Sequence, residues 1–190
     1  IPGRVQPAAV VRPSDHLVST AWQRSLTVPT TGWPAGAYLL LLTAADGKEK
    51  YVPLTVRSDT ARDAVVIVNA VNTYEAYNEW GGYSLYNGPD KSFASRAHRV
   101  SFDRPFARYP QVTDNPLSLG SGEFLLFEFP FTFWLEQQGY DVTYCTNEDV
   151  HVGGTPFISR AKAFLSIGHD EYWSRPQFDA CLGAIKAGVN

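Results

Sequence analysis

The sequence lacks several features that would point to particular protein classes. It contains no methionine and only two cysteines, Cys145 and Cys181, so it has no disulfide framework and no cysteine-based metal motif. We expect both to be free thiols packed as small hydrophobic side chains. The longest apolar runs, 38–45 and 124–135, are too short to span a bilayer. These absences argue against a disulfide-rich domain, a zinc finger and a membrane-spanning chain.

Charge is also sparse and evenly spread. The 190 residues include 16 lysines and arginines and 19 aspartates and glutamates, which gives a formal net charge of −3. No basic run is present, so we expect neither nucleic acid nor a membrane as a partner. A small-molecule substrate is expected instead. No targeting segment is visible, and the sequence leaves the cellular compartment open.

Familiar catalytic motifs are missing as well. The sequence has no G-x-S-x-G elbow, which argues against acyl transfer by a serine nucleophile. It has no H-E-x-x-H and no paired C-x-x-C, the usual markers of zinc sites. The glycine pairs Gly81-Gly82 and Gly153-Gly154 match neither the P-loop nor the dinucleotide-binding pattern. Any chemistry must therefore come from a less common set of side chains.

The N-terminal part has the pattern of a β-structure. Short strands are predicted over three apolar segments, at 26–28, 37–43 and 50–56. Asp46-Gly47 supplies a tight turn between the last two. We interpret residues 1–58 as an incomplete β-sandwich-like segment. The polar stretch 57–60 marks the junction with a second domain, residues 59–190.

The second domain follows an α/β pattern. Apolar strands are predicted at 64–69, 98–102, 141–146 and 163–167. Helices are predicted at 121–138, with a kink or a later start at Pro130, and at 174–187, with Ser174 as the N-cap. Strands that alternate with helices in this way predict a parallel sheet. We expect this sheet to be incomplete at Asn190, so that its open edge needs a homo-oligomer or a complementing chain.

Two polar segments between these elements are predicted to be loops. Residues 103–122 contain proline and asparagine, and loops of this length are often used for binding. Residues 147–151 follow the strand at 141–146 and are interpreted as a solvated loop at the same rim. Neither segment carries a motif of its own.

Two other stretches hold most of the reactive side chains. Residues 72–86 follow the apolar run 65–68, and residues 168–174 follow the strand at 163–167. The ends of parallel strands are where open α/β sheets bind ligands. The first stretch carries four phenols, Tyr74, Tyr77, Tyr83 and Tyr86. The second carries His169, Asp170 and Glu171, so the two together are suited to a hard, oxygen-ligated metal.

Each stretch also has a plainer interpretation. The phenols could form an aromatic cluster in the core, or, with Trp80, a face on which sugars stack. Asp170 and Glu171 lie just before a predicted helix, where negative charge is favoured without any catalytic role. His169 could then be a packing or capping residue. From the residues alone, these alternatives stay open.

The ordered motifs TYEAYN, WGGYSLYNG, SRAHRVSFDRP and GHDEYWS resemble the C-terminal catalytic domain of the N,N-dimethylformamidase large (β) subunit family. The resemblance covers residues 60–190, and the preceding segment is similar to the sandwich that precedes that domain. It implies a class I glutamine-amidotransferase-like α/β fold without the cysteine nucleophile. Two departures stand beside the implied site: the segment between the tyrosines is shorter here, and Asp170 replaces a proline.

The resemblance also implies a mononuclear iron, expected to be ferric, and a set of residues around it. The iron ligands fall on Tyr77, Tyr86 and Glu171, with Tyr74 as the rival for the first position, and the family's outer-sphere histidine falls on His169. The implied activity is that of an amidohydrolase that cleaves a small, non-peptide C–N bond. The iron would be the Lewis acid that activates water.

A second interpretation is non-catalytic. In that case Trp80, Tyr83 and the 103–122 loop form a surface that binds carbohydrate or another protein. A third is a metal-free relative retained for assembly.

Overall fold

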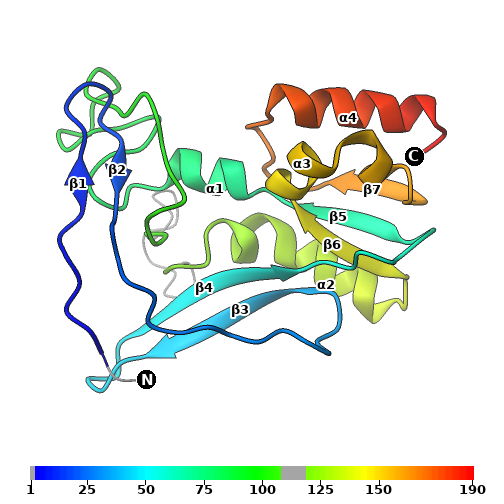
Figure 1. The fold of residues 1–190 in the computed structure, drawn as a ribbon, viewed down its shortest axis with the longest axis horizontal. Coiled ribbons are helices and arrows are strands. Elements are labelled where there is room, and N and C mark those ends of the chain that lie inside the picture. The colour runs from blue at the N-terminus through cyan, green and yellow to red at the C-terminus, as the bar shows by residue number, and fades with distance from the viewer. Residues whose placement is uncertain (1–2, 108–118) are drawn as a thin grey trace.

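The computed structural model describes residues 3–107 and 119–190, and a three-stranded parallel sheet lies at the centre of the α/β part (Figure 1). The strands run in the order β6–β5–β7 and comprise Val142–Thr146, Val65–Asn69 and Ala163–Ser166. Their parallel pairing confirms the sheet predicted from the short apolar strands. The mixed α/β class is therefore established. The more specific likeness to class I glutamine amidotransferases stays a prediction.

Side-chain alternation along β5 divides the core into two layers. Val66 and Val68 point to one face, where α3 (Asn147–Ile158) and α4 (Arg175–Lys186) cover the sheet. Ile67 points to the other face, toward α2 (Phe129–Gln137) and the hairpin of β3 (Gly36–Thr43) and β4 (Glu49–Val56). Because both faces are covered, the central strand is apolar at almost every position.

The two cysteines lie in the first of these layers. Cys145 is fully buried in β6, and Cys181 of α4 is partly buried against the same cluster. Both are free thiols, as predicted.

The N-terminal segment forms hairpins rather than a sandwich. Val10–Val11 (β1) pairs with Val18–Ser19 (β2), and Gly36–Thr43 (β3) pairs with Glu49–Val56 (β4), each antiparallel. The β3–β4 hairpin and its turn were predicted correctly. Among the described residues of this segment the two sheets stay separate, so the β-sandwich is not observed. The proposed boundary at residue 58 remains a prediction.

Two predicted strands are wrong because they have no partner. Residues 26–28 form no strand, and Leu26 is half exposed. Residues 98–102 form a loop that is attached to the N-terminal hairpin. There, His98 N donates to Asp15 O (2.8 Å) and Ser101 Oγ donates to Val18 O (3.2 Å). An apolar run without a neighbouring ladder does not become a strand.

The helices differ from the prediction in three places. Residues 124–128 form a single π-helical turn, and α2 begins at Phe129, with Pro130 in its first turn as the later start predicted. The predicted loop 147–151 is instead the start of α3, because Thr146 and Asp149 form a reciprocal capping box. A short helix that was not predicted, α1 (Val71–Tyr77), follows β5 directly.

The helix predicted at 174–187 is observed as α4. Ser174 caps α4 by accepting from Gln177 N, and Gly188 ends the turn after it with φ +91°. The chain then returns to the outer edge of β7, where Phe164 N donates to Asn190 O (2.8 Å). Residues 108–118 of the predicted 103–122 loop lie outside the described residues. Over the described ranges, no helix is both long and apolar enough to cross a bilayer.

Candidate active site

Helix α1 brings one phenol of the first stretch to the site and keeps another away from it. The helix starts just after β5, so its side chains gather at the carboxyl end of the sheet. Tyr74 faces inward and is buried, and its hydroxyl donates to Glu128 Oε1. Burial, followed by the charge of Glu128, raises the pKa of Tyr74 well above its ordinary value. Tyr74 thus contacts Glu128 whereas Tyr77 contacts Glu171, and the choice of Tyr77 over Tyr74 as a ligand stays a prediction.

Tyr86 reaches the same place from the loop that follows α1. That loop is held by Arg104, whose guanidinium donates to Glu75 Oε2 (3.0 Å) and to the Tyr83 carbonyl (2.8 Å). Arg104 and Glu75 are both buried, and burial raises the pKa of Glu75 to about 7 against the opposing charge of Arg104. A buried ion pair thus attaches the Tyr86 loop to α1.

The second stretch turns sharply after β7 to present Glu171. Gly168 adopts φ +66°, and a Cβ there would lie 2.6 Å from the Phe127 carbonyl oxygen, so the turn requires glycine. Thr73 of α1 then accepts from the Glu171 amide (2.9 Å) through its hydroxyl oxygen. Asp170 points away from the site and accepts from Asn147 Nδ2 (3.1 Å).

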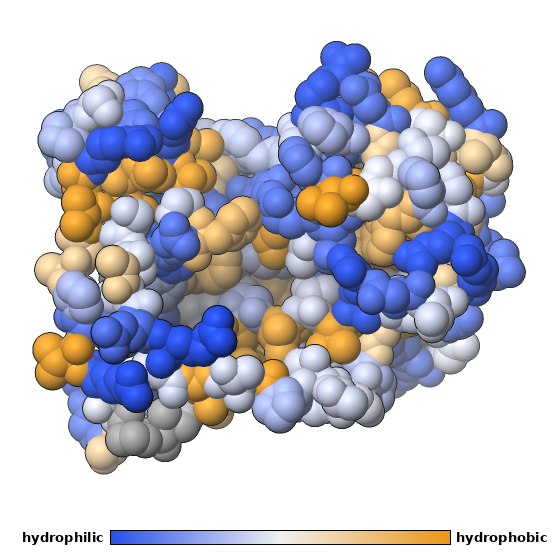
Figure 2. Space-filling view, viewed as in Figure 1, coloured by the Kyte–Doolittle hydropathy of each residue, from blue (hydrophilic) through white to orange (hydrophobic). Residues whose placement is uncertain are grey.

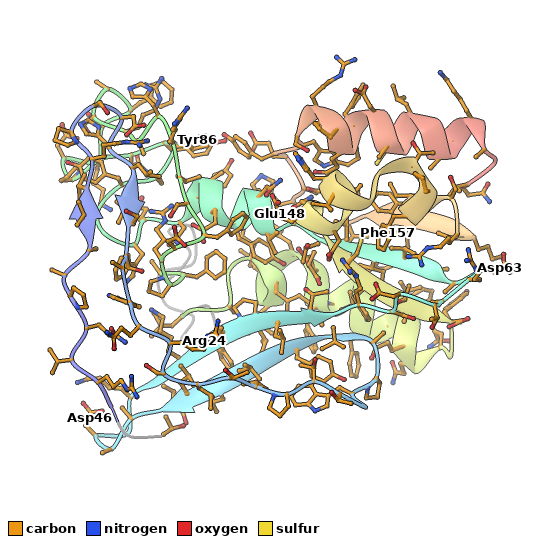
Figure 3. All side chains as sticks on the ribbon, in the orientation of Figure 1. Arg24, Asp46, Asp63, Tyr86, Glu148 and Phe157 are labelled. Carbon is orange, nitrogen blue, oxygen red and sulfur yellow. The ribbon has the colours of Figure 1, made fainter. Side chains whose placement is uncertain are left out.

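The three residues predicted as ligands converge. Tyr77 Oη donates to Glu171 Oε2 (2.7 Å), and Tyr86 Oη donates to Glu171 Oε1 (2.9 Å). The two phenol rings are stacked, with 4.3 Å between their centroids. Figure 3 shows Tyr86 in the loops that follow α1, on the side that faces the segment leading into α4. Two phenols from one stretch of the sequence thus meet at a carboxylate from the other.

His169 links this carboxylate to a second one. Its Nε2 lies 3.1 Å from Glu171 Oε2, and its Nδ1 lies 3.0 Å from Glu123 Oε2. Glu123 is buried at 1% exposure, whereas His169 is partly exposed. Sequence analysis did not identify Glu123, because a single carboxylate at the start of a predicted helix carries no distinguishing pattern.

Tyr172 is a further neighbour that the sequence analysis did not single out. Its hydroxyl donates to Tyr86 Oη (2.8 Å), and its ring packs edge-on against the Tyr86 ring. It stands within the GHDEYWS motif, and only the fold shows that it reaches Tyr86.

Protonation in the observed arrangement follows from these contacts. Burial raises the pKa of Glu171, but the hydrogen bonds from Tyr77, Tyr86 and His169 outweigh it, and the net shift is downward. Burial raises the pKa of Tyr86 well above its ordinary value. The carboxylate is therefore ionised, and the Tyr86 phenol keeps its proton as a donor to it.

The chemistry of these donors suits a hard cation. Two phenol oxygens and one carboxylate offer three oxygen ligands, and Glu171 keeps 45% side-chain exposure, so solvent reaches the group. Over residues 3–107 and 119–190, no group of three or more His, Cys, Asp or Glu side chains is arranged to hold a metal ion. Metal binding at this place would therefore depend on the phenols.

The aromatic residues of the alternative interpretation are engaged within the protein. Trp80 packs edge-on against Trp22 (5.6 Å between centroids), and Tyr83 stacks on His16 (4.8 Å). These contacts occupy ring surface that a bound sugar would need.

The fold and the convergent phenols define an α/β protein with a polar cluster at the switch between β5 and β7, the usual ligand position in such sheets. Comparison with family models assigns it further: residues 1–190 match the model described as N,N-dimethylformamidase beta subunit-like, C-terminal. The chain belongs to this family, as its motifs predicted. No curated protein matches the chain.

Proposed function

We propose that the protein is an iron-dependent amidohydrolase acting on a small, non-peptide C–N bond. The observation that carries the proposal is the single carboxylate of Glu171, which receives one hydrogen bond from each of two stacked phenols. The family takes its name from an enzyme that hydrolyses an amide, which supports this class of reaction. The substrate itself is left open by the departures beside the site.

Tyr77, Tyr86 and Glu171 are the residues that would hold a mononuclear ferric ion. Loss of the two phenol protons would leave three negative oxygens, which balance a triply charged cation. A bound ferric ion would supply Lewis-acid activation of water and of the substrate carbonyl. The partial exposure of Glu171 leaves room beside this group for a small substrate.

His169 is the residue proposed to transfer protons as a general base and acid. Its two ring nitrogens lie within hydrogen-bond distance of Glu171 and Glu123. Glu123 would orient the ring, while Glu171 lies on the side where the substrate would bind. A histidine in this position can accept a proton from water and return it to a departing amine. Tyr172 adds a phenol donor behind Tyr86, which orients that ring.

We further propose that a complementing chain covers part of the protein. The family is named for a subunit, which implies an enzyme of more than one chain. Helix α2 carries a cluster of exposed rings, in which Phe131 stacks on Trp134. A class I glutamine-amidotransferase-like arrangement remains the proposed fold of the α/β part.

Iron content and the visible spectrum test the metal site directly. Protein produced with iron is expected to bind about one equivalent and to absorb in the visible range, because phenolate ligands transfer charge to ferric iron. Tyr77→Phe and Tyr86→Phe should each weaken the band and lower the iron content. Tyr83→Phe is the matched control, since Tyr83 stacks on His16 and is not one of the side chains that hydrogen-bond to Glu171. A colourless, iron-free wild type would refute the proposal.

Activity is tested separately with the iron-loaded protein. Hydrolysis of small amides, followed by release of amine, should be lost in Glu171→Gln and retained in Tyr83→Phe. If iron binds but no amide among a panel of formamides and acetamides is cleaved, the reaction class is wrong while the metal site stands.

A further inference from the structure

A cavity of about 430 Å³ opens between the β3–β4 hairpin and the carboxyl ends of β5 and β6. Figure 2 shows this face of the molecule hollowed between α1 and β4. Its volume lies within the range of small-molecule sites, roughly 300–1,000 Å³. Tyr77, Tyr86 and Glu171 do not line it, so it is distinct from the candidate active site. Tyr74 and Phe106, which pack edge-on, form the wall nearest α1.

The walls of the cavity are unusually aromatic. Five rings line it: Tyr38, Tyr74, Phe102, Phe106 and Phe124. They come from β3, α1, the loop after it and the turn before α2, so the fold gathers them from separate segments. The faces of aromatic rings are electron-rich and attract cations.

The polar groups of the lining mainly offer oxygen acceptors. Thr55 donates its hydroxyl proton to Asn69 Oδ1 (2.8 Å), and Thr146 donates its own to Asp149 Oδ2 (2.9 Å). Asn69 in turn donates an amide proton to Glu128 (2.7 Å). With these protons committed to the protein, a ligand meets chiefly oxygen lone pairs.

The charge of the lining is negative. Asp149 is paired with Arg57 outside the cavity, whereas the side chain of Glu148 is exposed and makes no hydrogen bond or ion pair with the described residues. Figure 3 places Glu148 at the start of α3, above β4. Among the described lining residues there is no lysine, arginine or histidine. An anion would therefore be repelled, and a neutral apolar ligand would leave the oxygens without partners.

We propose that this cavity is a second binding site, specific for a small organic ammonium cation that carries an apolar or aromatic group. The ammonium donates to Glu148 and to the oxygens of Thr55 and Asn69, while the rings enclose the apolar part. The inference does not depend on the iron site, because the two share no proposed ligand-binding residue.

Three probes of the same size test the charge preference. Benzylammonium, benzyl alcohol and benzoate are each titrated into the intact chain, with amide chemical shifts and calorimetry as readouts. Benzylammonium is expected to bind saturably, about fivefold or more tightly than benzyl alcohol, with benzoate not binding. The shifted amides should include those of Thr55, Asn69 and Glu148. Equal binding of the alcohol and the ammonium, or no saturable binding of any probe, would overturn the proposal.

Two substitutions test the residues. Glu148→Gln should weaken benzylammonium binding about fivefold, and Phe102→Leu about threefold, because each removes one attraction for the cation. Both side chains are exposed enough for the fold to be retained, which thermal unfolding checks. Glu49→Gln is the matched control, since Glu49 is exposed and outside the cavity. If all three variants bind as the wild type does, the assigned site is wrong.

Discussion

Tyr77 and Tyr86, which are separated by only eight residues in the sequence, stack ring on ring and donate to the two different oxygens of Glu171. The stacked rings thus present both hydroxyls to the same carboxylate. Two protons thus lie between the two phenol oxygens and the two carboxylate oxygens. A cation that binds there replaces those protons, and the protein frame needs little rearrangement.

His169→Ala should weaken iron binding without unfolding the protein. The imidazole joins Glu171 to the buried Glu123, and loss of such an orienting partner typically lowers metal affinity roughly 10–100-fold. Because the imidazole is also a hydrogen-bond partner of the buried Glu123, the free energy of unfolding should fall by about 1–3 kcal/mol, which leaves the protein folded. Competition with a chelator measures the affinity. His98→Ala, at an exposed position away from the site, serves as the control; equal affinities in both variants would exclude the proposed role.

Arg104→Gln should destabilise the protein strongly. The guanidinium donates to the Glu75 carboxylate and to two loop carbonyls, and its loss leaves a buried carboxylate without its cation. The free energy of unfolding is expected to fall by about 3–5 kcal/mol in denaturant titrations. Arg104→Lys keeps the charge but cannot make the same set of hydrogen bonds. Its free energy of unfolding should therefore lie between those of the wild type and of Arg104→Gln. Arg62→Gln, at an exposed position, is the control, and a similar cost in both glutamine variants would contradict this explanation.

The sequence predicts best where local pattern and tertiary partner agree. The apolar run predicted at 64–69 forms β5, whose two faces are both covered. Ser174 is an N-cap because its hydroxyl oxygen accepts a hydrogen bond from Gln177 N in the following turn. The strand predicted at 98–102 fails, since its apolar residues have no ladder to join. Residues 147–151 form a helix because Thr146 and Asp149 cap each other, a pairing that the sequence analysis overlooked.

The candidate site shows the same limit. The motifs singled out Tyr77, Tyr86, His169 and Glu171, and the fold brings these four side chains together, while their roles stay a prediction. They did not separate Tyr77 from Tyr74, because positions three residues apart on a helix lie on the same side of it. The direction of the Tyr74 side chain depends on Glu128, which lies more than fifty residues away and accepts a hydrogen bond from the Tyr74 hydroxyl. Long-range polar partners of this kind leave no trace in local spacing.

Gly168→Ala should strain the turn that carries His169 and Glu171. The residue has φ +66°, and a Cβ would meet the Phe127 carbonyl, so both the backbone and its neighbour must move. We expect a loss of about 1–3 kcal/mol in the free energy of unfolding, together with weaker iron binding. Gly139→Ala separates strain from contact, because Gly139 has φ +77° with no atom near its added Cβ. If both variants retain full iron affinity, the turn does not position the site.

The stability of the protein should depend on pH through Glu128. Burial raises the pKa of this carboxyl from 4.5 to about 7, although Tyr74, Ala70 and Asn69 donate to it. Between these two values the unfolded chain has released the proton while the folded protein still holds it. The stabilising contribution of Glu128 is therefore complete below about pH 4.5 and is lost as the pH rises toward 7.

Glu128→Gln should reduce this fall by up to roughly 3 kcal/mol, the free energy that corresponds to the gap between the two pKa values. Denaturant titrations at pH 4.5, 6 and 8 measure it. Glu75 has a similarly raised pKa, so part of the wild-type slope should persist in the variant. Asp63→Asn, on an exposed carboxyl, should keep the wild-type slope. A Glu128→Gln protein whose stability changes with pH as steeply as the wild type would show that Glu128 is already ionised at pH 5, held by its three donors.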